Sequence, residues 1–328
     1  MRVEVLQWLQ CPETNEPLEL APGAETASDG HVMRGTLSTK GGKRYDIVDG
    51  VPVLIPGSTT SLEKETADRF AEEWHRWSEL RDYYEKQFLD WVAPVGKDDF
   101  KDKVVFEGGC GKGRHTHVVA NMGVKAIVSV DLGTSAYVAF RNTRHLTNAH
   151  VVIGDLLQPP VQRVFDLAFS VGVLHHLPDP RAGFLSLSSK VKPGGRVVFW
   201  VYGHENNEWI TRFVDPVRKQ LTARLDSNVL RALSAVPTAG LFGLIKVAYD
   251  KKRNPFVASL PYGEYFASMH DFPFDELHSI VFDQLVTPVA YYLRGDEVRA
   301  WFEGKPFSNV EVRWHRKYSW TGTAQIPS

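Results

Sequence analysis

Three acidic residues of the sequence could recognise a cationic ligand. Glu107, Asp131 and Asp155 each end a short apolar run that predicts a β-strand, in "VVFE", "IVSVD" and "VVIGD". A carboxylate at the first position suits an ammonium group or a bound water. The second could accept both hydroxyls of a ribose, and the third the exocyclic amine of a purine. Three carboxylates along one edge would repel a pyrophosphate, so they favour a nucleoside that carries a cationic amino acid.

A turn of spaced glycines follows the first of these acids. Gly109, Gly111 and Gly113 in "EGGCGKGRHT" allow a tight turn and let a ligand approach the main chain. The helix expected after the turn presents unpaired amide groups and the positive end of its dipole. Taken alone, the turn would suit a dinucleotide, a nucleoside or no ligand at all. Together with the acids it indicates S-adenosylmethionine.

Over 101–203, and more loosely towards the C-terminus, the chain resembles the class I S-adenosylmethionine-dependent methyltransferases. The matching stretches, in order, are "VFEGGCGKGRHT", "IVSVDLGTSAYVAFRNT", "VVIGDLLQP", "FDLAFSVGVLHHLPDP" and "VKPGGRVVFWVYG". The resemblance implies an enzyme with S-adenosylmethionine as its cofactor. It also implies that the methionine portion meets Glu107, Gly109, Gly111 and Gly113. The ribose would meet Asp131 and Leu132, and the adenine Asp155 and Leu156. Ser170 and Val171 would lie beside the sulfonium.

The pattern of the chain predicts the fold that would position these residues. From about Asp102, apolar strand runs alternate with helices, which is typical of a doubly wound, mostly parallel α/β sheet covered on both faces. The resemblance implies seven strands in a Rossmann-like methyltransferase fold. Right-handed crossovers bring the ends of such strands to one edge, where ligands bind. We expect a small β-rich domain over 1–57, a helical cap or linker over 58–100, and a methyltransferase domain over 101–328 with a helical lid insertion at about 204–285.

The helical cap is predicted from apolar and aromatic residues at helical spacing between Ser61 and about Trp91. Its start stays open, because Ser61 followed three residues later by Lys64 is not a capping box. In similar methyltransferases this segment folds over the cofactor. The alternative is that its aromatic stripe is simply part of the core.

Methyl transfer from a sulfonium needs mainly a nucleophile held in line, and a general base helps when the acceptor is a hydroxyl. His175 and His176 follow the fourth strand and Tyr202 ends the fifth, so we expect a base among them. The alternative for a histidine is a backbone hydrogen bond at a helix start. The insertion gathers histidines and acids, among them Asp283, which could also form a metal site or a solvated face. We expect an acceptor pocket without metal, formed by Trp74, Tyr84, His204, Tyr265, His270 and His278.

The N-terminal stretch, which closes with "YDIVDGVPVLIP", resembles the small zinc-ribbon-like activator domain of several tRNA, rRNA and protein methyltransferases. That family has two cysteine pairs, whereas here Cys11 stands with Thr14, Ser38 and Gly41 at the remaining positions. A structural zinc usually needs four ligands. We therefore expect the fold without zinc, serving as a docking or dimerisation module, which makes a homodimer one expectation for the assembly.

Composition sets the remaining expectations. A formal net charge of −1 offers no overall basic field for nucleic acid, and 43% hydrophobic with 23% charged residues is ordinary for a soluble globular protein. The most apolar window begins at Val229 and contains Arg231, Pro237 and Lys246, which argues against a membrane span. We predict a cytoplasmic protein.

The acceptor is predicted less directly than the cofactor. The low net charge and the helical insertion favour a small molecule or a glycan, methylated on a hydroxyl in a biosynthetic pathway, with no strong sign of a nucleic-acid partner. One alternative is an RNA or protein methyltransferase, prompted by the front domain. The other is a non-catalytic regulator or subunit that binds S-adenosylmethionine.

Overall fold

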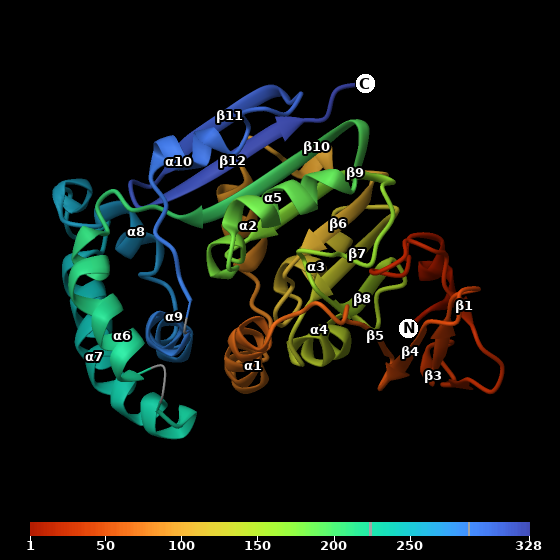
Figure 1. Cartoon of the computed structure of the whole chain (residues 1–328). Coiled ribbons are helices and arrows are strands. Elements are labelled where there is room, and N and C mark those ends of the chain that lie inside the picture. Colours follow the sequence, from red (N-terminus) through yellow and green to blue (C-terminus); the bar gives the residue numbers. More distant parts are fainter. Residues whose placement is uncertain (223–224, 288) are drawn as a thin grey trace.

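The computed structural model describes residues 1–222, 225–287 and 289–328. A twelve-stranded sheet crosses the molecule, and seven of its strands follow the order β8-β7-β6-β9-β10-β12-β11. The first five of these are parallel, whereas β12 is antiparallel to both of its neighbours (Figure 1). The predicted doubly wound, mostly parallel α/β fold is confirmed. These strands are β6 Val104–Gly108, β7 Ala126–Asp131, β8 Ala149–Gly154, β9 Phe165–Val171, β10 Val191–Tyr202, β11 Ser308–His315 and β12 Ser319–Gln325.

Helices bury both faces of this sheet, because successive side chains of a strand point to opposite sides. In β6, Val105 packs with α2 and α3 on one face, and Phe106 packs with α5 on the other. Both side chains are fully buried. The strand runs are therefore apolar throughout rather than alternating, as a doubly covered parallel sheet requires. The helices are α2 Tyr84–Val92, α3 Arg114–Ala120, α4 Ser135–Thr143, α5 Pro180–Ser189 and α10 Gly295–Ala300.

The strand order reverses direction at β6. Strand β7 lies on one side of it and β9 on the other, so the chain leaves the ends of β6 and β9 towards opposite faces of the sheet. Such a switch point opens a crevice beyond the carboxyl ends of the strands, where ligands of open α/β sheets bind. The glycine turn begins in this crevice, directly after β6.

The N-terminal region is continuous with the large sheet. Strand β5 pairs in parallel with β8, with Val53 opposite Ile153. The lone thiol of Cys11 is buried and lies 3.1 Å from the hydroxyl of Tyr45. This region contains the short helix η1 Val3–Gln7 and the strands β1 Glu19–Leu20, β2 Glu25–Thr26, β3 Val32–Ser38, β4 Arg44–Val48 and β5 Val51–Leu54.

Helix α1 spans Ser61–Arg76 and begins with a capping box one residue before the pair considered in the sequence. The hydroxyl of Thr60 accepts a hydrogen bond from the amide of Glu63, and the Glu63 carboxylate accepts one from the amide of Thr60 at 2.7 Å. These reciprocal bonds satisfy two amides that the helix leaves free. Helix α1 ends before Trp77, so the predicted helical segment consists of two helices, α1 and α2.

The insertion after β10 is mostly helical and lies at one end of the molecule (Figure 1). Helix α9 packs between α7 and α1, with Leu277 and Phe282 in its buried faces. Its opposite side contributes to the crevice above the strand ends. The insertion contains the π-helical turn η4 Ile210–Val214, then α6 Asp215–Gln220, α7 Ser227–Ala248, η6 Val257–Ser259, α8 Gly263–Ser268 and α9 Phe274–Val286; two further short turns, η2 Lys97–Asp99 and η3 Leu174–His176, lie elsewhere.

Candidate active site

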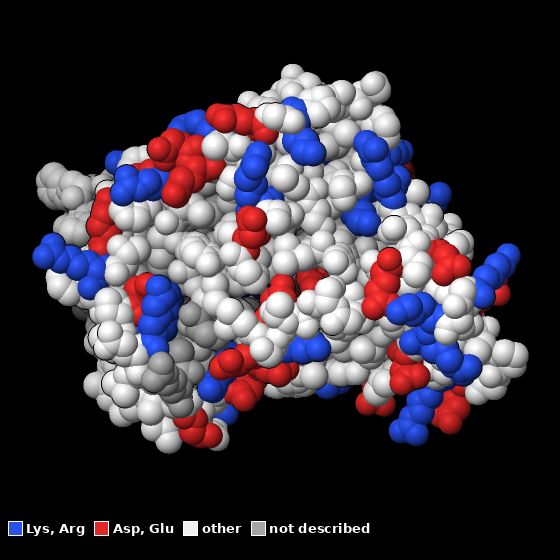
Figure 2. Space-filling view, viewed as in Figure 1, with Lys and Arg blue, Asp and Glu red and all other residues white. Residues whose placement is uncertain are grey.

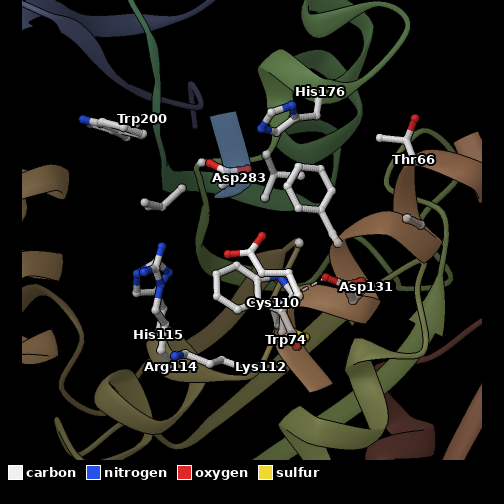
Figure 3. Close-up of a pocket in the computed structure, with 18 of the residues that line it drawn as sticks. Thr66, Trp74, Cys110, Lys112, Arg114, His115, Asp131, His176, Trp200 and Asp283 are labelled. Carbon is white, nitrogen blue, oxygen red and sulfur yellow. Dashed lines mark hydrogen bonds between the residues drawn. The ribbon is translucent and has the colours of Figure 1, made fainter. Parts of the chain in front are cut away.

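A cavity of about 210 Å³ lies between the strand ends on one side and α1 and α9 on the other (Figure 3). It has two halves. One is formed by the turns after the parallel strands, and the other by aromatic and charged side chains of the cap, β10 and the insertion. Of the residues predicted to hold the cofactor, seven line it: Gly109, Gly111, Asp131, Leu132, Asp155, Leu156 and Val171.

The turn requires glycines for its own conformation and packing as well as for the approach of a ligand. Gly109 and Gly111 have φ of +83° and +52°, in the left-handed region that favours glycine. A Cβ on Gly109 would lie 2.3 Å from Cγ2 of Val173, and one on Gly111 would lie 2.9 Å from Nε1 of Trp74. The turn therefore packs against the rim of the cavity, and Trp74 of α1 covers it from the cap side.

The second and third strand-end acids are fixed by main-chain donors. The amides of Gly111 and Gly133 donate to Asp131 at 2.8 and 3.0 Å, so this carboxylate ties the glycine turn to the start of α4. Asp155 accepts from the amide of Leu157 at 2.8 Å and also from the Thr59 hydroxyl at 2.9 Å. Burial raises the pKa of both carboxyl groups, and the hydrogen bonds oppose that rise.

Glu107 lies behind the cavity wall rather than in it. Its side chain is 1% exposed, and its Oε2 accepts from the hydroxyls of Thr116 at 2.5 Å and Ser129 at 2.7 Å. Burial raises the pKa of this carboxyl to about 7. Glu107 thus links α3 to β7. Ser170 donates to a main-chain carbonyl, and Gly113 caps α3. Neither Ser170 nor Gly113 lines the cavity.

Two cations that were not among the predicted site residues face the cavity beside the glycine turn. The Nζ of Lys112 donates to the carbonyl of Trp77 at 2.8 Å and lies 5.4 Å from the ring centre of Trp74. Burial lowers the pKa of Lys112 to about 8. The guanidinium of Arg114 lies 5.7 Å from the Tyr84 ring and 5.3 Å from the Trp91 ring. The sequence offered a sign of these cations, because Lys112 lies between two glycines of the turn and Arg114 directly follows the last one.

The other half of the cavity combines flat aromatic walls with buried polar atoms that have no partner among the described residues. These atoms are Nε1 of Trp200, Oδ1 of Asp283 and Oε2 of Glu73. The other Asp283 oxygen accepts from the Tyr202 hydroxyl at 2.9 Å, and the other Glu73 oxygen from the Ser279 hydroxyl. Burial raises the pKa of Asp283 to about 6 and that of Glu73 well above its usual value. Figure 3 shows Trp200, Asp283 and His176 together in its upper part.

The three residues predicted as bases have different surroundings. His176 lines the cavity, and its Nδ1 lies 2.7 Å from the carbonyl of Val289, the backbone contact that was the alternative to a catalytic role. Burial lowers its pKa to about 4. His175 is fully buried behind it, with its ring 3.9 Å from the ring of Tyr202. Tyr202 lines the cavity and donates to Asp283, so burial and that carboxylate raise the pKa of its hydroxyl.

The residues predicted to bind the acceptor separate into two sets. Trp74 and Tyr265 line the cavity. Tyr84 is buried next to it, and its hydroxyl donates to Glu276 at 2.9 Å. The histidines lie outside: His278 contacts the hydroxyl of Ser234 between α7 and α9, His270 contacts Asp271, and His204 follows β10 beyond the lining.

Comparisons with known proteins define the class. Residues 106–199 match a family model described as a methyltransferase domain. The chain is 31% identical over 105 residues to the tRNA U34 carboxymethyltransferase of Cellvibrio japonicus, which covers 30% of this chain and 32% of that protein. It is 24% identical over 183 residues to the enzyme of the same name from Pseudoalteromonas translucida, covering 51% and 55%. The solved structure of a DhpI–SAH complex superposes on 82% of this chain and 99% of that one, at 14% identity and a TM-score of 0.51.

These findings confirm three predictions. The fold is that of the class I methyltransferases, the protein is a methyltransferase-type enzyme, and S-adenosylmethionine is its cofactor. The match extends over about a third of the length of the first of these relatives and about half of the second.

The predicted acceptor is wrong. We expected a small molecule or a glycan and no strong sign of a nucleic-acid partner, whereas the curated relatives are named as tRNA-modifying enzymes. The RNA alternative agrees better with this finding. The inference failed because net charge averages the whole surface, and an enzyme can bind RNA through a few local contacts.

Proposed function

We propose that the protein transfers a methyl group from S-adenosylmethionine, or a carboxymethyl group from a derivative of it that carries a carboxylate on the methyl carbon, to a uridine of tRNA. The observation that carries this proposal is the acceptor half of the cavity. There the unpartnered indole N–H of Trp200 and the unpartnered carboxylate oxygen of Asp283 lie among the aromatic rings of Trp91, Tyr202 and Tyr265. The names of the curated relatives support the same substrate.

The residues of the other half suit the cofactor. Asp131 would accept from the ribose hydroxyls and Asp155 from the adenine amine, while the bare main chain at Gly109 and Gly111 leaves room for the methionine portion. Lys112 and Arg114 place positive charge beside the same turn, where a carboxylate would be attracted. When bound, the cofactor supplies an electrophilic carbon on a sulfonium.

A flat heterocycle with both N–H and carbonyl groups matches the acceptor half. Enzymes that modify a base take it out of its stack, hold it between aromatic side chains and read its edge by hydrogen bonds. Asp283 can accept from the imide N–H of uracil, and Trp200 can donate to a uracil carbonyl. Without such a ligand each of these buried polar atoms costs free energy, on the order of 1–3 kcal/mol. The site therefore favours a ring that satisfies both.

Asp283 also offers a place for a proton. Its raised pKa of about 6 leaves it largely ionised at neutral pH, in contact with the hydroxyl of Tyr202. An ionised carboxylate in this position would hold or accept the proton of the acceptor.

We infer that residues 1–57 act in cis as the activator domain that they resemble, without zinc. Two contacts support this: β5 extends the methyltransferase sheet beside β8, and the linker after it places the Thr59 hydroxyl on Asp155, at the predicted adenine position. A separate subunit would have to form such contacts across an interface.

The test uses the full chain and an unmodified tRNA transcript with S-adenosylmethionine or, in a separate reaction, its derivative carboxylated on the methyl carbon, followed by digestion and mass analysis of the nucleosides. We expect a modified uridine whose added mass identifies the group transferred, and loss of that product in Asp283→Asn and Trp200→Phe. Tyr291→Phe, at an exposed tyrosine outside the cavity lining, is the matched control. Binding of the cofactor with no tRNA product, and no salt-dependent affinity for tRNA, would refute the proposal.

A further inference from the structure

Helix α7 carries an apolar face that the rest of the described chain leaves open. Its members recur at helical spacing along about five turns and are between 49% and 76% exposed. They are Val229, Leu233, Val236, Leu244 and Val247.

The helix is apolar on its other side as well. Leu230 and Ile245 are buried in the clusters that α7 shares with α9, and no charged residue occurs between Arg231 and Lys246. By length and composition this helix could cross a membrane. Only 22% of its most apolar stretch is buried inside the protein, so most of that stretch is exposed. Helices that are apolar all round are normally enclosed, and an open face of this kind marks a site of contact.

The same insertion contains a second group of exposed apolar residues. Four of them precede α7 and recur every four residues along η4 and α6, namely Trp209, Phe213, Val217 and Leu221, and the fifth, Phe256, follows α7. All five are at least 48% exposed. Figure 2 shows mostly uncoloured surface at the lower left, where Figure 1 places α7.

The C-terminal end of this apolar surface is basic. Between Ser227 and Phe256 the chain has five bases and one acid, and Lys251, Lys252 and Arg253 follow α7 directly as exposed residues. The one acid, Asp250, is buried and pairs with Arg253.

We propose that α7 docks this face on the surface of a membrane that contains anionic lipids, with the helix lying along the bilayer. Apolar side chains would enter the boundary of the acyl chains, and the bases would meet lipid phosphates. The helix lies on the membrane and does not span it, because the Ser234 hydroxyl contacts His278 of α9 and the Thr238 hydroxyl donates to the Ser234 carbonyl on its inner side.

Charge argues against a second copy of the chain as the occupant. Pairing two α7 faces parallel would bring the two basic ends together, and like charges facing each other disfavour that arrangement. Pairing them antiparallel would bring the basic end of each helix towards both Arg231 and Asp226 of the other, whose opposite charges leave no net attraction for it. An anionic lipid surface complements the same charges.

The test is flotation of the full chain with phosphatidylcholine vesicles, with and without phosphatidylglycerol. We expect it to float with the anionic vesicles, and less so at high salt. Val236→Asp and Val247→Asp should each weaken binding about tenfold or more, because a valine that the membrane would bury becomes a charge. Val310→Asp, at an exposed valine of β11 outside the insertion, should bind as the unaltered chain does.

Thermal unfolding of each variant shows whether it remains folded, and sedimentation without lipid gives the assembly. No binding to either vesicle by the folded chain would overturn the proposal, and so would a dimer that Val236→Asp dissociates. Equal binding to neutral vesicles would overturn the role of the bases. None of these readouts depends on tRNA modification, so this proposal and the proposed function can fail separately.

Discussion

The substitution Gly111→Ala tests the architecture of the cofactor half. Gly111 has a φ of +52°, and an added Cβ would lie 2.9 Å from the indole nitrogen of Trp74. The left-handed conformation costs a residue with a side chain about 1–2 kcal/mol. In addition, either the indole or the turn must move, and the turn holds the amide that donates to Asp131 at 2.8 Å.

Gly123→Ala separates these two effects. Gly123 has a φ of +80°, but the nearest atom to its added Cβ is a flexible lysine carbon at 3.9 Å. Both variants should lose about 1–2 kcal/mol of unfolding free energy from backbone strain. Only Gly111→Ala disturbs a hydrogen bond to a carboxylate, worth about 1.5–3 kcal/mol, so it alone should lose about tenfold to a hundredfold in cofactor affinity.

Calorimetric titration with S-adenosylmethionine measures that affinity, and urea unfolding measures the stability. If Gly111→Ala binds the cofactor as tightly as Gly123→Ala while losing the same stability, the turn has no role in binding beyond its conformation. The account of the cofactor half would then be wrong.

Three further substitutions test other contacts. Burial raises the pKa of the Asp283 carboxyl to about 6 in the folded protein, above its value of about 4 in the unfolded chain, so this group lowers the free energy of unfolding as pH rises through that window. Asp283→Asn removes the group, and the free energy of unfolding measured in urea should then depend less on pH between about 4 and 7. Thr59→Val should weaken cofactor affinity several-fold in calorimetry, because Asp155 loses a donor worth about 1 kcal/mol. Thr116→Val should cost about 1–3 kcal/mol of stability in the same unfolding assay, because Glu107 is left with fewer donors in a buried site.

Each of these has a matched comparison. Glu264→Gln alters an exposed acid of the same insertion and should leave the pH profile unchanged. Ser58→Ala and Thr211→Val remove exposed hydroxyl contacts and should change neither affinity nor stability measurably. A pH profile for Asp283→Asn parallel to that of the unaltered chain would show that this carboxyl is not the titrating group.

The sequence predicted the parts of the site that local pattern determines. Strand periodicity places Asp131 and Asp155 at the ends of parallel strands, and such ends share one edge of the sheet. The same reasoning could not tell which side a strand-end residue faces, so Glu107 turned out to bind Thr116 and Ser129 behind the cavity. Local pattern also left the start of α1 open, because the capping box is formed by Thr60 and Glu63 rather than by Ser61 and Lys64.

The acceptor half was beyond the sequence because its parts come from distant segments. Glu73 of α1 and Ser279 of α9 are 206 residues apart and join in one hydrogen bond, and Tyr202 and Asp283 are 81 apart. Neither pair has a spacing that either segment reveals by itself. Packing of α9 against α1 decides the contact, and that packing depends on where the whole insertion lies.

The buried acids of the site imply that cofactor binding is linked to protons. Burial raises the pKa of Glu107 to about 7 and that of Asp283 to about 6, and it also raises that of Asp131. A cationic ligand favours the ionised form of a nearby carboxyl and lowers its pKa. Binding should therefore release protons, and affinity should rise as pH increases towards about 7.

Titrations in buffers of different ionisation enthalpy measure this release. Glu107→Gln keeps an oxygen for Thr116 and Ser129 but removes the carboxyl whose pKa burial raises to about 7, so it should bind the cofactor with less proton release near pH 7. The opposite sign, with affinity falling as pH rises from 5 to 7, would mean that the acids stay protonated around the ligand. The site would then recognise hydrogen-bond acceptors on the cofactor rather than its positive charge.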